Sequence, residues 1–316
     1  MADAGTQTQN GSMTPGIGKM TLTVAPVSSL ISVSTTPSSP PPKQTSEKFI
    51  LMDKLSTVER VILCASELFG TAILVFLGCM SCAIGLSGGN VPHVQISFAF
   101  GLAVMLSVQT FGHISGSHIN PIITIAAAVT GQLAFIEVPI YFIGQFVGAF
   151  IGYGLLMSIT PEHHQAKYEL RHTGLNITEN VKVLGVCSPQ MNAELSGLQV
   201  MFCEFLLSLL FVLIVCSVWD YRNANKHDSV ALKLGLAITG LALAGGPFSG
   251  ANMNPARSFA PAAWHGDWNL HWAYWIGPIL AGFVGGALYR ILFTKPRPVE
   301  VEDTIEITPL KQRNTN

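Results

Sequence analysis

Six stretches of this chain are long and apolar enough to cross a lipid bilayer, and this constrains the fold more than any other feature. A crossing helix needs about 20 mostly apolar residues, and in the hydrocarbon core every backbone N–H and C=O group must find its partner within the protein. Only 11% of the 316 residues are charged, which is typical of a membrane protein rather than of a large soluble core. The six stretches are 60–85, 92–111, 134–159, 199–219, 231–248 and 270–294. The chain is therefore predicted to be an all-α membrane protein with six transmembrane helices.

Two further apolar stretches, 120–130 and 254–264, are too short to span a bilayer, and each follows the same motif. The motif is Ser-Gly-x-x-x-Asn-Pro, written SGSHINP at 115–121 and SGANMNP at 249–255. Asn is a strong N-cap residue and Pro suits the first helical position, so we expect two half-helices that enter the membrane without crossing it. Irregular backbone at membrane depth is tolerated only where it is buried in protein or lines a wet cavity. The pair of motifs therefore indicates a central pathway.

The Asn120-Pro121 and Asn254-Pro255 pairs also indicate what this pathway carries. The amide oxygen of each Asn caps its helix, which leaves the NH₂ group to donate to a molecule in the lumen. Each helix start carries about half a positive elementary charge, so two facing helix starts repel cations, including protons. Water or another neutral solute is the cargo that this arrangement favours.

The two halves of the chain match beyond the motif. Glu67 in ASELFGTAILVF corresponds to Glu204 in FCEFLLSLLFVL, and GQFVGAFIG at 144–152 resembles GPILAGFVGG at 277–286. Three spans per half is an odd number, so the second repeat is expected to lie inverted relative to the first. The expected parts are a disordered tail at 1–48, the first repeat at 49–159, a connecting loop at 160–198, the second repeat at 199–294 and a second tail at 295–316.

The positions of Lys and Arg predict the orientation in the membrane. Five lie at or before the start of span one, three between spans four and five, and five from the end of span six onward, against three in the 160–198 loop. The positive-inside rule places both tails in the cytoplasm and this loop outside. The loop also carries Asn176-Ile-Thr, a glycosylation acceptor that is usable only on the outer side. No signal peptide is visible in 1–48, and we expect an integral protein of the plasma membrane.

These segments resemble the aquaporin or major intrinsic protein family. The resemblance covers about 55–294 and rests on GHISGSHINP, on SGANMNPARSF and on the pair of glutamates that open the two repeats. It implies the aquaporin fold of six spans and two re-entrant half-helices in two inverted repeats, assembled as a homotetramer in which each protomer holds its own pore. It also implies a channel in the lipid bilayer rather than an enzyme, with no cofactor and no nucleic-acid partner. Ile122 departs from the family pattern, in which Ala is usual at this place, whereas the second motif keeps Ala256.

By this resemblance Phe100, Ala242, Ala251 and Arg257 form an outer selectivity filter. A charge at membrane depth costs about 2.5–3.5 kcal/mol, so Arg257 is expected to face a polar cavity, where its guanidinium offers fixed donors to water or a hydroxyl. Ala242 stands where water-selective members carry His, which makes the constriction wider and more apolar. The pattern resembles the insect glycerol-permeable channels, the entomoglyceroporins, although Ser258 stands where bacterial-type glycerol facilitators usually carry Asp.

We therefore predict a passive channel for water and glycerol, with urea as a further candidate, that excludes ions and protons. A strictly water-selective aquaporin is one alternative, because the alignment of Ala242 depends on the absence of a gap. A structural or junctional membrane protein with an incidental pore is another. A gradient-coupled transporter would need titratable groups in the pathway, where only Arg257, Glu67 and Glu204 qualify.

The remaining polar residues receive structural interpretations. Glu67 and Glu204 are expected to accept hydrogen bonds from the irregular backbone before each half-helix, and His113 and His118 to be loop histidines. The glycines of 144–152 are expected to allow close helix crossing. None of the six cysteines has the paired spacing of a metal site or a disulfide framework, so all six are expected to be small buried residues and no metal site is expected.

Overall fold

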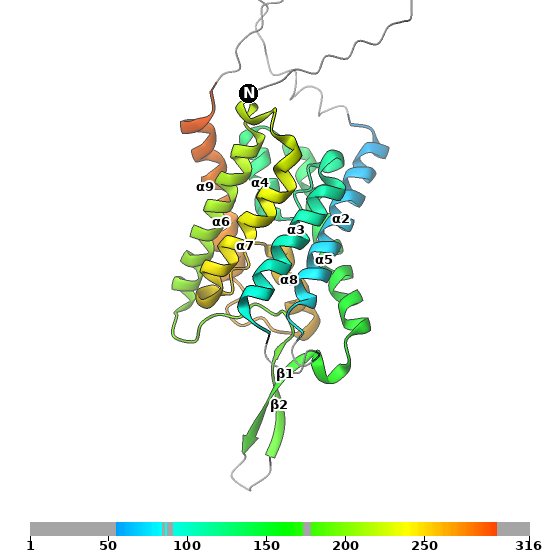
Figure 1. Ribbon diagram of the computed structural model, residues 1–316, viewed down its shortest axis with the longest axis vertical. Helices are drawn as coiled ribbons and strands as arrows, with labels where there is room; N and C mark the ends of the chain where they lie inside the picture. The colour runs from blue at the N-terminus through cyan, green and yellow to red at the C-terminus, as the bar shows by residue number, and fades with distance from the viewer. Residues whose placement is uncertain (1–54, 84–85, 87–90, 173–177, 296–316) are drawn as a thin grey trace, which may run out of the picture. The chain divides into compact units, whose positions relative to one another are not determined.

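The computed structural model describes residues 55–83, 86, 91–172 and 178–295. Six helices in this part of the chain are long and apolar enough to cross a membrane (Figure 1). They are α2 (Thr57–Met80), α3 (His93–Ser115), α5 (Val138–Ile159), α6 (Gly197–Trp219), α7 (Val230–Ser249) and α9 (Ala273–Leu288). Short helices at Phe135–Glu137, Glu162–His164, Tyr221–Asn223 and His227–Ser229 lie between them, and a π-helical turn at Tyr289–Phe293 extends α9.

Two shorter helices, α4 (Pro121–Thr130) and α8 (Pro255–His265), follow α3 and α7. In Figure 1, α4 lies in the upper half of the bundle and α8 in the lower half. Six spanning helices with a short helix in each half confirm the predicted fold class.

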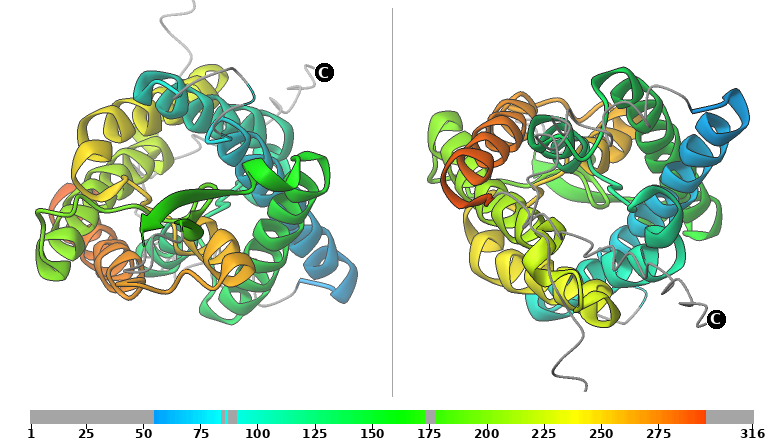
Figure 2. Two further views of the ribbon diagram at one scale, coloured as in Figure 1. Left: turned by 90° about the horizontal axis from the view of Figure 1, so that it is seen from below. Right: turned by 90° about the horizontal axis from the view of Figure 1, so that it is seen from above.

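The spanning helices surround the two short ones (Figure 2). In the first half α2 packs against α3 and α5, and in the second half α6 packs against α7 and α9, while α3 and α7 join the two halves. Each short helix packs chiefly against a helix of the other half, α4 against α9 and α8 against α5. The exchange ties the halves together and brings both short helices to the interior.

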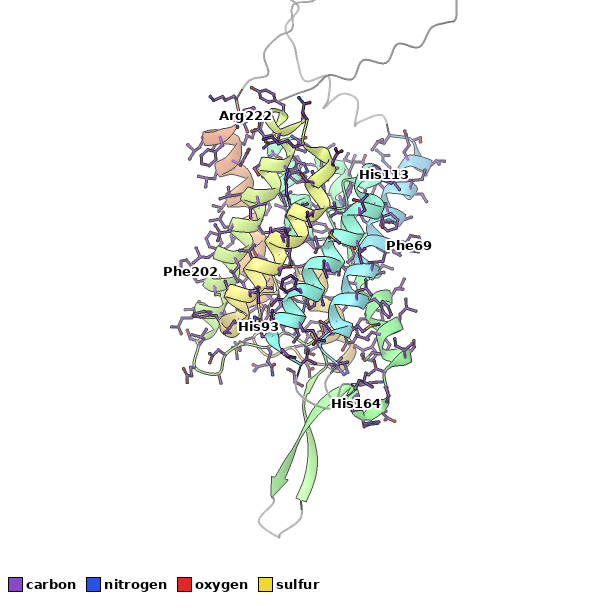
Figure 3. All side chains as sticks on the ribbon, in the orientation of Figure 1. Phe69, His93, His113, His164, Phe202 and Arg222 are labelled. Carbon is purple, nitrogen blue, oxygen red and sulfur yellow. A yellow bond between two sulfur atoms is a disulfide. The ribbon has the colours of Figure 1, made fainter. Side chains whose placement is uncertain are left out.

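The outer surface of the bundle is apolar. Phe69 of α2 and Phe202 of α6 are 57% and 56% exposed, and both point away from the bundle in Figure 3. Exposed apolar side chains can face lipid with little free-energy cost, because the hydrocarbon core of a bilayer is as apolar as they are.

Glycines allow the closest helix contacts. A Cβ atom on Gly148 of α5 would lie 2.2 Å from the carbonyl oxygen of Leu68 on α2, which only glycine avoids. In the second half the pattern differs from the first, because Gly282 of α9 faces the Ile122 backbone of α4, while Gly277 faces α6. Small residues on two faces of α9 therefore contact a spanning helix and a half-helix.

An antiparallel hairpin of β1 (Ala166–His172) and β2 (Thr178–Gly185) lies within the segment that the sequence predicts as a loop. It extends from the end of the bundle opposite to the start of α2 and the end of α9 (Figure 1). Its base is closed where the Val186 N–H donates to the Gln165 carbonyl at 2.9 Å. Asn176 and the predicted tails, apart from Lys295, lie outside the described residues.

The structure corrects the interpretation of the cysteines. Cys79 at the end of α2 and Cys187 after β2 form a disulfide, with their Cα atoms 5.3 Å apart. Cys64, Cys82, Cys203 and Cys216 form no disulfide within the described residues. The pair is 108 residues apart in the chain, so local spacing has no bearing on whether the two sulfurs meet.

Candidate functional site

The two loops that precede the short helices have the same unusual backbone. Gly116 and Gly250 end α3 and α7 in the left-handed region, at φ values of 82° and 84°. Two non-glycine residues of each loop also have left-handed φ values. They are Ser117 (47°) and Ile119 (46°) in the first loop, and Ala251 (49°) and Met253 (51°) in the second. Such conformations are costly and persist only where the surroundings hold them.

Glu67 holds the first loop. Its side chain is fully buried, and its carboxylate accepts from the backbone N–H groups of His118 and Ile119 at 2.8 and 2.7 Å. It also accepts from the Ser115 hydroxyl at 2.7 Å and the Gln145 amide at 2.8 Å. All four contacts are donors to the carboxylate, as a structural acceptor requires.

Glu204 does the same for the second loop. It is also fully buried, and it accepts from the N–H groups of Asn252 and Met253 at 2.9 and 2.7 Å and from the Ser249 hydroxyl at 2.6 Å. The two loops are thus held by matched sets of contacts from opposite halves of the chain.

The starts of the two short helices are linked to each other. The Asn120 amide oxygen accepts from the Ile122 N–H at 3.1 Å, and that of Asn254 accepts from the Ala256 and Arg257 N–H groups at 3.0 and 3.2 Å. The NH₂ groups, expected to donate into the lumen, also bridge the two halves. Asn120 donates to the Met253 carbonyl and Asn254 to the Ile119 carbonyl, each at 2.9 Å. One N–H of each amide is used in this way, which leaves the other to face the lumen.

A cavity of about 840 Å³ passes this junction. Asn120 and Asn254 line it, as do all four residues predicted for the filter, which are Phe100, Ala242, Ala251 and Arg257. The lining continues to Trp219 near one end of the bundle and to His164 near the other. Residues from both halves thus surround a single space.

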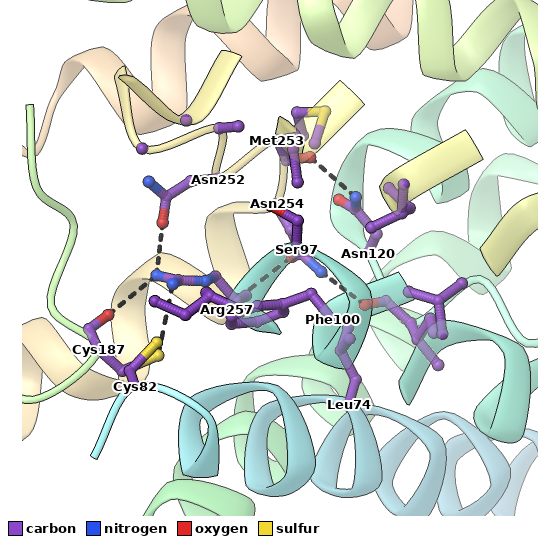
Figure 4. Close-up of a pocket in the computed structure, with 18 of the residues that line it drawn as sticks. Leu74, Cys82, Ser97, Phe100, Asn120, Cys187, Asn252, Met253, Asn254 and Arg257 are labelled. Carbon is purple, nitrogen blue, oxygen red and sulfur yellow. Dashed lines mark hydrogen bonds between the residues drawn. The ribbon is translucent and has the colours of Figure 1, made fainter. Parts of the chain in front are cut away.

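Arg257 occupies one wall of this cavity (Figure 4) and is only 8% exposed. Its Nη1 donates to the Cys187 carbonyl at 3.0 Å and also to the Asn252 amide oxygen, and its guanidinium carbon lies 4.8 Å from the centre of the Phe100 ring. These contacts compensate for the burial of the charge and fix the plane of the guanidinium. Cys187 and Asn252 are site residues that the sequence interpretation missed.

A histidine lies beside Ala242. His93, in the first turn of α3, donates from Nε2 to the Ala242 carbonyl at 3.0 Å and lies 3.4 Å from the Ser97 hydroxyl. A Cβ atom on Gly246 would lie 2.0 Å from the His93 ring, so the glycine makes room for it. His93 also lines the cavity, and Figure 3 shows it near the hairpin end of the bundle. The sequence offered a weak signal for it, because a polar residue opens an apolar span.

Four residues in the first turns of the two short helices lie behind the lumen. Ile122 and Ala256 have no exposed surface and belong to two hydrophobic clusters, and Pro121 and Pro255 are buried at the first helical positions. Ile122 packs against α9 and is not among the residues that line the cavity.

Three histidines near the short helices differ in their environments. His118 is buried, with Nδ1 at 3.2 Å from the Thr124 hydroxyl, and lines the cavity, while His113 is exposed on the last turn of α3. His271, before α9, lies 3.1 Å from the Ser258 carbonyl through Nε2. Burial lowers the pKa of His271, and because a carbonyl only accepts, the neutral ring carries its proton on Nε2. Among the described residues no cluster of three or more His, Cys, Asp or Glu side chains has the geometry of a metal site.

Comparison with known proteins gives consistent results. Residues 54–289 match the family described as Major intrinsic protein. The lens fiber major intrinsic protein of Mus musculus is 35% identical over 244 residues, which are 77% of this chain and 84% of that protein, and the Homo sapiens protein is 34% identical over the same shares. The X-ray structure of the aquaglyceroporin from Plasmodium falciparum superposes with a TM-score of 0.63 at 21% identity, covering 74% of this chain and 96% of that one.

Proposed function

The chain belongs to the major intrinsic protein family and is a membrane channel rather than an enzyme, and from this premise we propose that it conducts water and glycerol. Urea is a further candidate permeant. The observation that carries the proposal is that the small residue Ala242 lines the same cavity as Arg257.

The shape of this constriction suits a polyol. Glycerol has an apolar edge of CH groups and a polar edge of hydroxyls. Phe100, Ala242 and Ala251 supply apolar lining, and the Arg257 guanidinium, which lies over the Phe100 ring, supplies donors beside it. Polar groups that lose water without gaining partners cost roughly 2–7 kcal/mol, so a wider lumen lowers the barrier for a solute that keeps some of its water.

Two features support the exclusion of cations and protons. Arg257 carries a positive charge at the constriction. The starts of α4 and α8 meet at Asn120 and Asn254, where both helix dipoles present their positive ends. The free N–H of each Asn orients a water by its oxygen, which interrupts a chain of proton transfer.

One observation favours the water-selective alternative. The His93 imidazole is bonded to the Ala242 carbonyl, so a histidine from α3 lies close to the place where a filter histidine on α7 would lie. If His93 narrows the lumen enough, the channel passes water alone.

The test is stopped-flow light scattering on proteoliposomes, which compares the unaltered chain with Ala242→His. We expect the unaltered chain to pass glycerol well above empty vesicles. Ala242→His is expected to reduce glycerol permeability about tenfold and to keep most of the water permeability, because an imidazole narrows the lumen and adds a polar wall.

Ala244→His is the matched control, because Ala244 lies two residues further on α7 with an exposed side chain. Its water and glycerol permeabilities should equal those of the unaltered chain. Conduction of water alone by the unaltered chain would reject the glycerol proposal in favour of the water-selective alternative. Water permeability no higher than that of bare lipid would favour a structural or junctional role.

The assembly and sidedness are also proposals. We expect a homotetramer in the plasma membrane, with both termini in the cytoplasm and the hairpin outside. The Cys79–Cys187 disulfide supports this orientation, because disulfides persist in oxidising compartments and this one lies at the hairpin end. Asn120 and Asn254 are proposed as the half-helix caps at the pore centre, with Pro121, Ile122, Pro255 and Ala256 packed behind them. Phe100, Ala242, Ala251 and Arg257 are proposed as the filter.

A further inference from the structure

A short segment after the hairpin forms part of the filter wall. This segment, residues 185–188, is called the filter strap below. All four of its residues line the cavity, and its Cys187 carbonyl accepts from Arg257 Nη1 at 3.0 Å. The Cys187 sulfur lies 3.4 Å from Arg257 Nη2 (Figure 4). The strap therefore decides where one edge of the guanidinium lies.

Hydrogen bonds anchor the strap on the side of α5 and α8. The Gly185 N–H and the Ser188 hydroxyl both donate to the Asp267 carboxylate at 2.7 Å. The Tyr153 hydroxyl donates to the Val186 carbonyl at 2.5 Å. These contacts fix both ends of the strap, and the Ser188 N–H, in the same peptide as the Cys187 carbonyl, donates to the Gly185 carbonyl at 3.1 Å. The disulfide adds to this turn hydrogen bond.

The disulfide supplies a restraint at Cys187 itself. Cys187 has φ of 63°, a left-handed conformation that a non-glycine residue adopts only where its surroundings hold it. Its sulfur is bonded to Cys79, which is fully buried in the last turn of α2 and has no freedom to follow a moving strap. The link thus ties the Cys187 peptide, and with it the carbonyl that Arg257 contacts, to a spanning helix.

We propose that the Cys79–Cys187 disulfide is a positioning element of the filter, which holds Arg257 against the wall and sets glycerol passage relative to water. The inference rests on the proposed function, since it concerns the same constriction. Without the link the Cys187 carbonyl turns away and Arg257 keeps the Asn252 amide as its acceptor. The freed guanidinium N–H then binds solutes in the lumen. Glycerol, with three hydroxyls, is retained more strongly than water.

The experiment uses the full chain in proteoliposomes. Peptide mapping under non-reducing conditions first establishes that Cys79 is paired with Cys187 and not with Cys82, which lines the same cavity. Water and glycerol permeabilities are then measured for Cys79→Ala/Cys187→Ala and normalised to the amount of folded protein. Cys64→Ala is the matched control, because it makes the same change on α2 at a residue that does not line the cavity and leaves the disulfide in place.

We expect the ratio of glycerol to water permeability to fall about fivefold in the double variant, the size of effect that one lost charge-assisted hydrogen bond produces, and to be unchanged in Cys64→Ala. Cys79→Ala/Cys187→Gly should show a fall at least as large, because it lacks the same link and glycine adds backbone freedom at position 187. This second variant also serves if the first does not fold.

Three results would overturn the inference. The first is an unaltered ratio of glycerol to water permeability in folded double variants that are shown to lack the disulfide. The second is an equal fall of the water and glycerol permeabilities, which would mean that the disulfide only stabilises the fold. The third is the absence of the Cys79–Cys187 pair from the unaltered protein. If the unaltered chain passes no glycerol, the glycerol proposal fails by itself. The role of the disulfide is then decided by the water permeability of each folded channel, which should change in the double variant alone.

Discussion

At the scale of single residues, the filter has Ala at position 242, and a histidine from another helix, His93, lies beside it. Ala242 lines the cavity, while the His93 ring of α3 contacts the Ala242 carbonyl through space that Gly246 leaves open. The imidazole is thus outside the usual filter position but close to it. Removal of the His93 ring therefore tests whether this side chain restricts solutes.

His93→Ala is expected to raise glycerol permeability about twofold to threefold, because a ring is removed from the lining and one polar contact is lost, with little change for water. The measurement is stopped-flow light scattering on proteoliposomes. His113→Ala is the control, since His113 is exposed at the opposite end of the same helix. Equal losses of water and glycerol permeability in His93→Ala would instead mean that the ring stabilises α3 and does not select solutes.

At the scale of elements, each short helix depends on a glutamate in a neighbouring span. Glu204 of α6 accepts three hydrogen bonds from the end of α7 and the loop before α8, and Glu67 of α2 accepts three from the end of α3 and the loop before α4. Either loop would otherwise bury N–H groups without partners, at a cost of about 1–3 kcal/mol each. The half-helices can therefore be short, because glutamates on neighbouring spanning helices fix the loops from which they start.

Glu204→Gln is expected to lower the free energy of unfolding by about 2–4 kcal/mol, because the new amide turns an N–H toward donors that have lost their acceptor. Thermal unfolding in detergent, followed by the loss of the monodisperse species, measures this. Glu194→Gln, at an exposed glutamate in the segment before α6, should leave the midpoint unchanged. A proton-relay role for Glu204 predicts the opposite pattern, with unchanged stability and altered proton flux.

At the scale of the whole molecule, the two halves are bound to each other through the centre of the helix bundle. The reciprocal Asn120–Met253 and Asn254–Ile119 hydrogen bonds and the exchanged packing of α4 and α8 make each half incomplete without the other. Both half-helices start at the same level, and they continue toward opposite ends of the bundle (Figure 1). The bundle is therefore expected to insert in the membrane as one unit, with a single orientation.

If the hairpin end is extracellular, Asn176 should receive an N-linked glycan in eukaryotic cells. Glycosidase treatment is then expected to increase the mobility of the unaltered chain on a gel, and Asn176→Gln should remove this shift. A sequon placed in the 296–316 tail should stay unmodified, as a cytoplasmic segment. Modification of the tail sequon would reverse the proposed orientation.

Local features of the sequence determined most of the fold. The six apolar stretches, the Asn-Pro helix starts and the too-short segments after them predicted the spanning helices and the half-helices, because span length and capping depend on neighbouring residues. Glu67 and Glu204 could also be assigned as acceptors, since a buried acid beside an irregular loop has few other uses. The hairpin was missed, because its alternation is brief and polar.

Only the tertiary structure decided which distant groups meet at the constriction. The Cys79–Cys187 link, the contact of Arg257 with the Cys187 carbonyl and the position of His93 beside Ala242 join segments 108, 70 and 149 residues apart. No local pattern encodes such pairs, because each depends on how whole helices and the hairpin pack. A chain of this kind can therefore be assigned to its fold from its own residues, while the details of its filter depend on which side chains that packing brings within hydrogen-bonding distance.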